Sequence, residues 1–303
     1  SGISDETMEP AGKALSLLVI MTGVLIAMFV PIFDSYKIDP ASLTDMGRHD
    51  LETYRLKWLL GALAAVVVGL LAANFTAQKN EKGWGAMKYP QLVLGMIAIF
   101  VYVGVEVSTA SNLPAYMEKN LNFLTKDIAP YISLYWASLM IGRWTGAVEA
   151  FTGNLSLQKI LRFIAPYLAF LVFLGVNKLM NHDLSPFYIY ALVILVLIFA
   201  DMASKGNPAK MLLIFSLLGC VALFIGMFTS GMTSVYAFTS VGLFCSTLWP
   251  CIFTLAISGL GKNTSQGSSF LIMMIMGGGF VSLLQGYVAD ETTIQTSYIV
   301  GVL

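Results

Sequence analysis

Long apolar stretches recur along this chain and are separated by short polar connections. A helix needs about 20 residues to cross the roughly 30 Å of hydrocarbon in a bilayer. Nine such membrane-spanning segments are predicted, at 14–33, 56–75, 90–116, 128–151, 159–179, 186–203, 210–229, 235–259 and 266–289, with the start of a tenth after 296. The polar and apolar alternation of a membrane barrel strand is missing, so these spans are predicted to be α-helices in an all-α, polytopic membrane bundle.

Composition agrees with a protein embedded in a lipid bilayer. Hydrophobic residues make up 57% of the 303 residues and charged residues only 11%, and this excludes an ordinary soluble domain. The 17 basic and 17 acidic side chains cancel, so we expect no nucleic-acid partner. Because paired carboxylates, metal-spaced cysteines and the usual hydrolase motifs are missing, we predict no enzyme activity, no bound metal and no cofactor.

A basic, glycine-bearing connection at 76–89 (TAQKNEKGWGAMKY) has the character of a linker between two membrane bundles. We therefore expect 1–75 to be the end of an N-terminal bundle, with about two spans, and 90–303 to be a C-terminal bundle. Most Lys and Arg residues fall on the linker's side of the membrane, which favours a cytoplasmic linker. The opening residues 1–13 lack the features of a secretory signal, and both ends of the sequence look truncated.

Glu106 lies near the middle of the third span, where an ionisable side chain costs about 2.5 to 3.5 kcal/mol to bury. Thr109, Asn112 and Pro114 follow it, and Pro114 is expected to bend or break the helix. A carboxylate, a hydroxyl and an amide on one broken helix would suit a ligand rich in hydroxyl groups. Two plainer interpretations stay open: Glu106 pairs with a buried partner or is protonated, and the hydroxyls pack between helices.

Charged residues near span ends are expected to have structural roles. Arg143 lies between Gly142 and Gly146, a small-xxx-small pair that lets helices approach closely, and its charge is expected to brace helix ends. Glu149 and Asp201 are close enough to the ends of their spans to reach water, so we predict that they are solvated.

Trp249 directly precedes Pro250 in the middle of the eighth span. The proline interrupts the helical hydrogen-bond ladder, while an indole offers a flat apolar face with one donor, a combination suited to sugar binding. Packing within the helix bundle is the competing interpretation.

Three successive glycines, Gly277, Gly278 and Gly279, occur in the ninth span and are followed by Gln285. Each glycine weakens a helix by up to about 1 kcal/mol, so we expect them to permit close backbone approach or bending. Gln285 is a candidate sugar contact or polar gate.

Three segments resemble one known family. They are YVGVEVSTASNLPAYM, YWASLMIGRWTGA and LWPCIFTLAISGLGKNTSQGSSFLIMMIMGGGFVSLLQGYVAD, and they are similar to the fucose/galactose/glucose:proton symporters of the major facilitator superfamily. The resemblance implies two six-helix bundles with a monosaccharide site between them, alternating access, and coupling to an ion, usually a proton, with sodium possible. It also implies the bacterial inner membrane. Glu106 matches the carboxylate of the family's helix-seven motif, and Trp249 and Pro250 fall at its helix-ten position.

Two departures from the family pattern are visible. Residues 157–204 add about two helices between the family's helices eight and ten, and helices one to four, which carry the family's proton-coupling carboxylates, are missing. The resemblance favours a secondary sugar transporter; the alternative is a non-transporting membrane scaffold or sensor derived from a transporter half.

Overall fold

The computed structural model describes residues 8–39 and 42–303, and every regular element within these ranges is helical. The long helices are α1 (Gly12–Ser35), α2 (Asp45–Lys79), α3 (Pro90–Leu121), α4 (Thr125–Phe151), α5 (Leu155–Leu179), α6 (Tyr190–Ser204), α7 (Pro208–Phe228), α8 (Gly231–Cys245), α9 (Leu248–Ile257), α10 (Thr264–Met273) and α11 (Gly277–Glu291). A short α12 (Ile294–Ser297) follows. Each predicted span coincides with one helix or with consecutive helices. Within the described ranges eight segments are long and apolar enough to cross a membrane, against nine predicted, and the segment that falls short is α4, at the predicted span 128–151.

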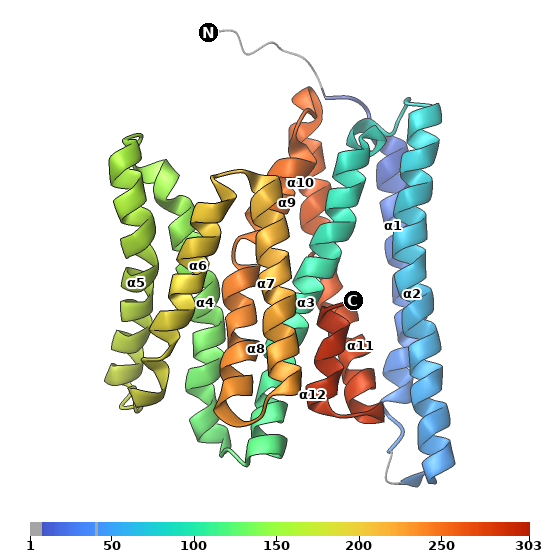
Figure 1. Cartoon of the computed structure of the whole chain (residues 1–303). Coiled ribbons are helices and arrows are strands. Elements are labelled where there is room, and N and C mark those ends of the chain that lie inside the picture. Colours follow the sequence, from blue (N-terminus) through green and yellow to red (C-terminus); the bar gives the residue numbers. More distant parts are fainter. Residues whose placement is uncertain (1–7, 40–41) are drawn as a thin grey trace.

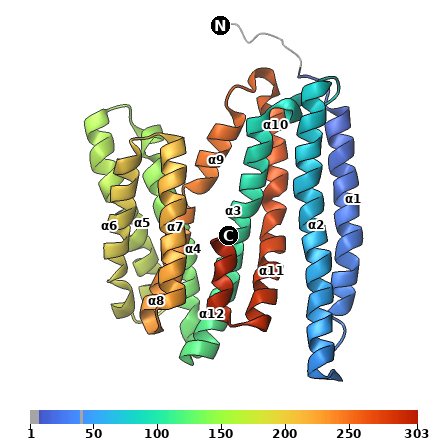
Figure 2. The same cartoon turned by 45° about the vertical axis from the view of Figure 1, so that its right-hand side comes forward.

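The helices run side by side, with α3 near the centre, the α1–α2 hairpin at one edge and α5 with α6 at the other (Figures 1 and 2). The connections 80–89, 152–154, 205–207 and 258–263 all lie at the upper end of Figure 1, which we call the linker end. The polar connections therefore alternate between two faces, as expected of helices that cross a membrane repeatedly.

Helix α3 packs against α11, α9, α8 and α4, so its most apolar stretch is largely buried. Its contact with α11 depends on Gly277: a Cβ atom there would lie 1.9 Å from the carbonyl oxygen of Phe100. The two backbones touch because one of them carries no side chain at this point.

Two local predictions require adjustment. Helix α2 continues to Lys79, so only 80–89 of the predicted linker 76–89 is a connection, and it contains a 3₁₀ turn at Gly85–Lys88. Helix α3 continues through Pro114 to Leu121 and is not broken there. Membrane helices accommodate an internal proline when neighbouring groups satisfy the freed carbonyl.

The predicted interruption near Pro250 is present. Helix α8 ends at Cys245 and α9 begins at Leu248, leaving Ser246 and Thr247 outside both helices. The ring of a proline clashes with the carbonyl four residues earlier, which for Pro250 is that of Ser246. The eighth predicted span is thus two helices joined by a two-residue break.

Candidate functional site

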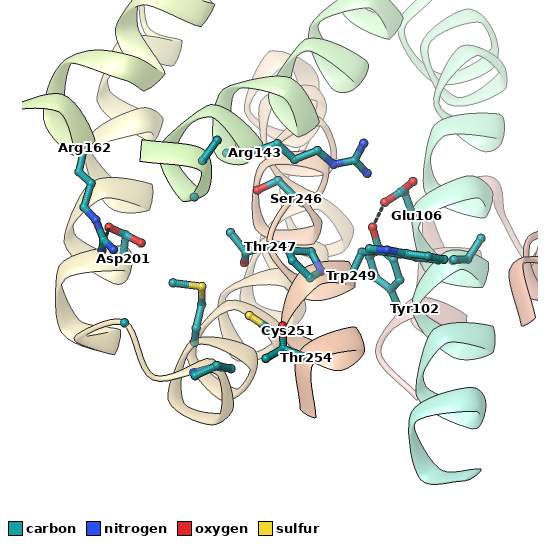
Figure 3. A pocket seen from close by; sticks show the side chains of 18 of the residues that line it. Tyr102, Glu106, Arg143, Arg162, Asp201, Ser246, Thr247, Trp249, Cys251 and Thr254 are labelled. Atoms are coloured by element: carbon teal, nitrogen blue, oxygen red, sulfur yellow. Dashed lines mark hydrogen bonds and ion pairs between the residues drawn. The ribbon is translucent and has the colours of Figure 1, made fainter. Parts of the chain in front are cut away.

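The break between α8 and α9 opens onto a cavity of about 890 Å³. Six of the long helices contribute residues to its wall, so the cavity lies between most of the helices of the bundle. Its polar lining includes Tyr102, Glu106, Arg143, Arg162, Asp201 and Thr247. Figure 3 shows this cavity with its polar side chains. Its size lies within the range of small-molecule binding sites.

Glu106 is held in place by two tyrosines. The hydroxyl of Tyr102, one helical turn earlier on α3, donates a hydrogen bond to the Glu106 carboxylate, and the Tyr135 hydroxyl of α4 donates to the Glu106 backbone carbonyl at 2.8 Å. The residue as a whole is only 9% exposed. Glu106 therefore has a buried hydrogen-bond partner, as the plainer interpretation of the sequence expected, and it also faces the cavity.

Arg143 extends from α4 toward the carboxylate of Glu106 (Figure 3). We predicted that its charge braces helix ends, and this role stays a prediction; the side chain lines the cavity and also a smaller pocket bounded by Trp136 and Trp144. A guanidinium is always charged and presents a rigid fork of donors. The cavity thus has one acidic and one basic side chain on facing helices.

The two residues of the helix break supply hydroxyl groups to the wall. The Ser246 hydroxyl donates to the Leu243 carbonyl at 2.6 Å. The Thr247 hydroxyl is buried and has no hydrogen-bond partner within the described ranges. A buried polar atom without a partner is uncommon, and a bound ligand is one explanation for it. Sequence reasoning missed Thr247, although its position three residues before Pro250 was a usable signal.

Trp249 lies beside Tyr102, with ring centroids 6.4 Å apart, and both line the cavity together with Pro250. Trp249 and Glu106 are the two predicted binding residues that the structure brings together. An aromatic face next to carboxylate and hydroxyl groups provides both contact types that a sugar ring uses, stacking and hydrogen bonding.

The other three predicted binding residues lie elsewhere. The Asn112 amide donates to the Ser108 carbonyl at 2.9 Å, within its own helix. The backbone carbonyl of Thr109 accepts from the Tyr298 hydroxyl, and the Gln285 amide donates to the Ser297 hydroxyl at 3.3 Å. Their contacts face the C-terminal segment or their own helix, and a binding role for them stays a prediction.

Asp201 contradicts the expectation of a solvated helix end. Its side chain is 4% exposed and pairs with Arg162 at 3.0 Å. The pair joins α6 to α5 and lines the same cavity as Glu106 (Figure 3). The side chain of Glu149, which we grouped with Asp201, lies outside the described residues.

The small residues singled out from the sequence differ in their surroundings. A Cβ atom at Gly142 would lie 1.7 Å from the Ser246 hydroxyl, whereas Gly146 has open space around it. In the glycine run, Gly277 contacts backbone, Gly278 has Val107 at 3.1 Å, and Gly279 has no neighbour within 4 Å. The close approaches are therefore at Gly142 and Gly277.

The helical arrangement and the central cavity define a polytopic helical membrane protein. A solved structure of the Escherichia coli fucose:proton symporter matches 88% of this chain and 56% of its own length, with a TM-score of 0.51 and 21% identity. This likeness establishes the fold. No family model matches the chain.

Comparison of sequences identifies relatives in the same group. The chain is 27% identical to a glucose/galactose transporter of Brucella abortus over 284 residues, covering 90% of the chain and 56% of that protein. It is 28% identical over 309 residues to a putative glucose/galactose transporter of Helicobacter pylori, covering 96% and 62%. An 89-residue stretch, 29% of the chain and 20% of the relative, is 37% identical to the L-fucose-proton symporter of E. coli.

The chain is thus similar along most of its length to proteins named as glucose/galactose transporters, and over a shorter stretch to an L-fucose-proton symporter, in agreement with the resemblance of its motifs. It spans between about half and two thirds of the length of the glucose/galactose transporters that it matches along most of its own length. These relatives are named as transporters, in agreement with the prediction of a protein that is not an enzyme.

Proposed function

We propose that this chain forms part of a secondary active transporter that carries a monosaccharide across the membrane by alternating access. One observation carries the proposal: Glu106, Tyr102, Trp249 and the unpartnered Thr247 hydroxyl meet at one cavity in the middle of the bundle. Charged, hydroxyl and aromatic groups together match the alternating polar and apolar faces of a sugar ring. The names of the relatives point to the same substrate class.

Coupling to protons is the second part of the proposal, with sodium as the alternative ion. A carboxylate at the depth of Glu106 is costly to keep charged in a membrane, so it is suited to take up and release a proton during transport. Its hydrogen bond from Tyr102 and the nearby Arg143 give the charged form support when the proton leaves. The linker end is proposed to face the cytoplasm of a bacterium, in the inner membrane.

The test is sugar uptake by the protein in its native length, reconstituted in proteoliposomes. Glucose, galactose and fucose would each be offered with an inward proton gradient, an inward sodium gradient, or none. We expect uptake of at least one sugar to follow the proton gradient. Glu106→Gln keeps the shape of the side chain and is expected to abolish or uncouple this uptake while the protein still inserts.

A control separates the site from general damage. Ser111 lies on α3 but is exposed, and its hydroxyl donates within the helix to Val107; Ser111→Ala should transport normally. Unchanged uptake by Glu106→Gln would refute the role of Glu106. Absence of sugar binding by the unaltered protein would favour a scaffold or sensor instead.

A further inference from the structure

The Arg162–Asp201 pair occupies a second charged region of the cavity, away from Glu106. Arg162 lies in the second turn of α5 and Asp201 in the last turn of α6, and their side chains are 19% and 4% exposed. In Figure 3 the pair lies across the cavity from the Tyr102–Glu106 hydrogen bond, with Ser246, Thr247 and Trp249 between them. The cavity therefore has two charged regions joined by a wall of hydroxyl and aromatic groups.

The two regions occupy different positions along their helices. Glu106 lies in the middle of α3, whereas Asp201 is only about 5 Å from the linker-end terminus of α6 at Ser204, at 1.5 Å per residue. Gly206 and Pro208, in and just after the α6–α7 connection, also line the cavity. The cavity thus extends from the middle of the bundle to the linker end, and the ion pair lies near that mouth.

A contribution to stability does not by itself account for this buried ion pair. Burying two charges costs about as much as their attraction returns, and apolar residues of similar volume often serve equally well or better. Ionisable side chains inside membrane bundles more commonly belong to substrate or ion pathways. A guanidinium and a carboxylate side by side offer a sugar hydroxyl both a donor and an acceptor.

We propose that Arg162 and Asp201 form a mouth subsite, a second sugar-binding position at the linker end of the cavity. It hydrogen-bonds sugar hydroxyls as the substrate moves between the Glu106 region and the solution on that side. This inference rests on the proposed function and adds a second binding position along the transport pathway. It predicts that the pair governs the rate of sugar passage more than the affinity of the central site.

The diagnostic variant replaces both partners at once, Arg162→Met with Asp201→Leu, in the protein at its native length. Removing one partner would leave a buried charge and could prevent folding, whereas the paired apolar replacement keeps the α5–α6 contact. We expect equilibrium sugar binding to change by less than about twofold and sugar flux to fall about tenfold, the loss expected for one hydrogen bond to a charged group. Unchanged flux in a folded double variant would show that the pair only joins α5 to α6.

A cysteine already present provides a second readout. Cys251 lines this cavity, whereas Cys220 lines a separate apolar crevice. In variants that retain one of these cysteines, transported sugar should slow maleimide labelling of Cys251 but not of Cys220. The protection of Cys251 should be lost in the double variant although sugar still binds; protection that persists unchanged would overturn the mouth subsite.

The two proposals fail differently. If the unaltered protein neither binds nor transports any sugar tested and Cys251 is not protected, both are overturned. If the unaltered protein transports sugar and the double variant matches it in flux and in Cys251 protection, the proposed function stands and the mouth subsite is overturned.

Discussion

Helices α2 and α3 are similar in length and almost equally apolar, yet they occupy opposite environments. In the most apolar stretch of α3, 67% of the residues are buried, against 28% in α2. The helices differ in where their polar residues fall. Glu106, Ser108 and Thr109 lie in the middle of α3 and are buried, while α2 carries its charged residues in its first four turns and at its far end.

The comparison shows that apolar content identifies a membrane helix but not its place in the bundle. Lipid tails and a protein interior are both apolar, so neither environment selects strongly among Leu, Val and Ile. A polar residue in mid-span does distinguish a helix in the protein interior from one that faces lipid, because its side chain needs a protein partner or a water-filled cavity. Polar positions in mid-span are therefore the better guide to the central helices.

The largest expected effect is on the contact that holds α3 in the centre. Gly277→Ala would place a methyl group against the Phe100 backbone, which cannot move aside as a flexible side chain could. We expect a loss of at least about 3 kcal/mol in stability, at the upper end of overpacking costs, visible as a lower melting temperature or loss of folded protein on size exclusion. Gly279→Ala, with no neighbour within 4 Å, is the matched control and should be neutral or slightly stabilising.

A smaller effect is expected at the aromatic wall that faces α3. Trp249→Ala removes the indole beside Tyr102 and should weaken sugar binding about tenfold, the value of one good aromatic contact. Trp58→Ala removes an indole from α2, where its ring neighbour is Tyr54, and should leave sugar affinity unchanged. Isothermal titration calorimetry measures the sugar affinity of both variants. If Trp58→Ala lost as much affinity as Trp249→Ala, the proposed difference between α2 and the central helices would be refuted.

At α2 itself the effect should be on the hairpin rather than on sugar binding. Arg55 is 7% exposed, donates to the Ser35 hydroxyl at 2.8 Å and to the Ser35 carbonyl at 2.9 Å, and lies 4.0 Å over the Tyr36 ring. Arg55→Leu should cost about 1 to 3 kcal/mol by leaving these groups and Glu52 without their donor. Thermal unfolding measures the loss, and the exposed Lys57→Leu should show none. A change in sugar affinity in Arg55→Leu would argue against separate roles for the two helices.

The smallest effect concerns the start of α1. A hydrogen bond from Lys88, supported by Asn263, lowers the pKa of Glu9 below its usual value, and the Glu9–Lys88 distance is 2.9 Å. A lowered pKa means that the contact stabilises the folded state at neutral pH and loses this contribution as pH falls through the Glu9 pKa. The contribution is under about 1 kcal/mol, because the pair is partly exposed. Glu9→Gln should therefore lower the melting temperature slightly at pH 7, and this difference should shrink as the pH is lowered through the Glu9 pKa; a difference that does not change with pH would exclude the ionic contact.

Much of this arrangement could be predicted from the sequence, and the exceptions have physical causes. Span length and composition determine where helices form, and Pro250 marked the break between α8 and α9. Glu106 and Trp249 were recognisable because their side chains are unusual where they occur. Asp201 was misjudged because proximity to a span end indicates depth along the helix, not the direction in which a side chain points. The position of Thr247 before Pro250 was a usable signal, but only the folded chain shows that its hydroxyl is buried without a partner among the described residues.

The two-residue break before Pro250 separates α9 from α8 at a possible hinge point. The ten residues of α9 form a helix about 15 Å long, joined to α8 through Ser246 and Thr247. A tilt of about 10° at this joint would move the far end of α9 by about 2.6 Å, roughly one hydrogen-bond length. Gly142 of α4 lies directly against Ser246 and so fixes the joint, and because α9 packs against α3, α7 and α10, a tilt of α9 would change its contacts with these helices as well. A small angular change here is enough to make or remove one contact with whatever occupies the cavity.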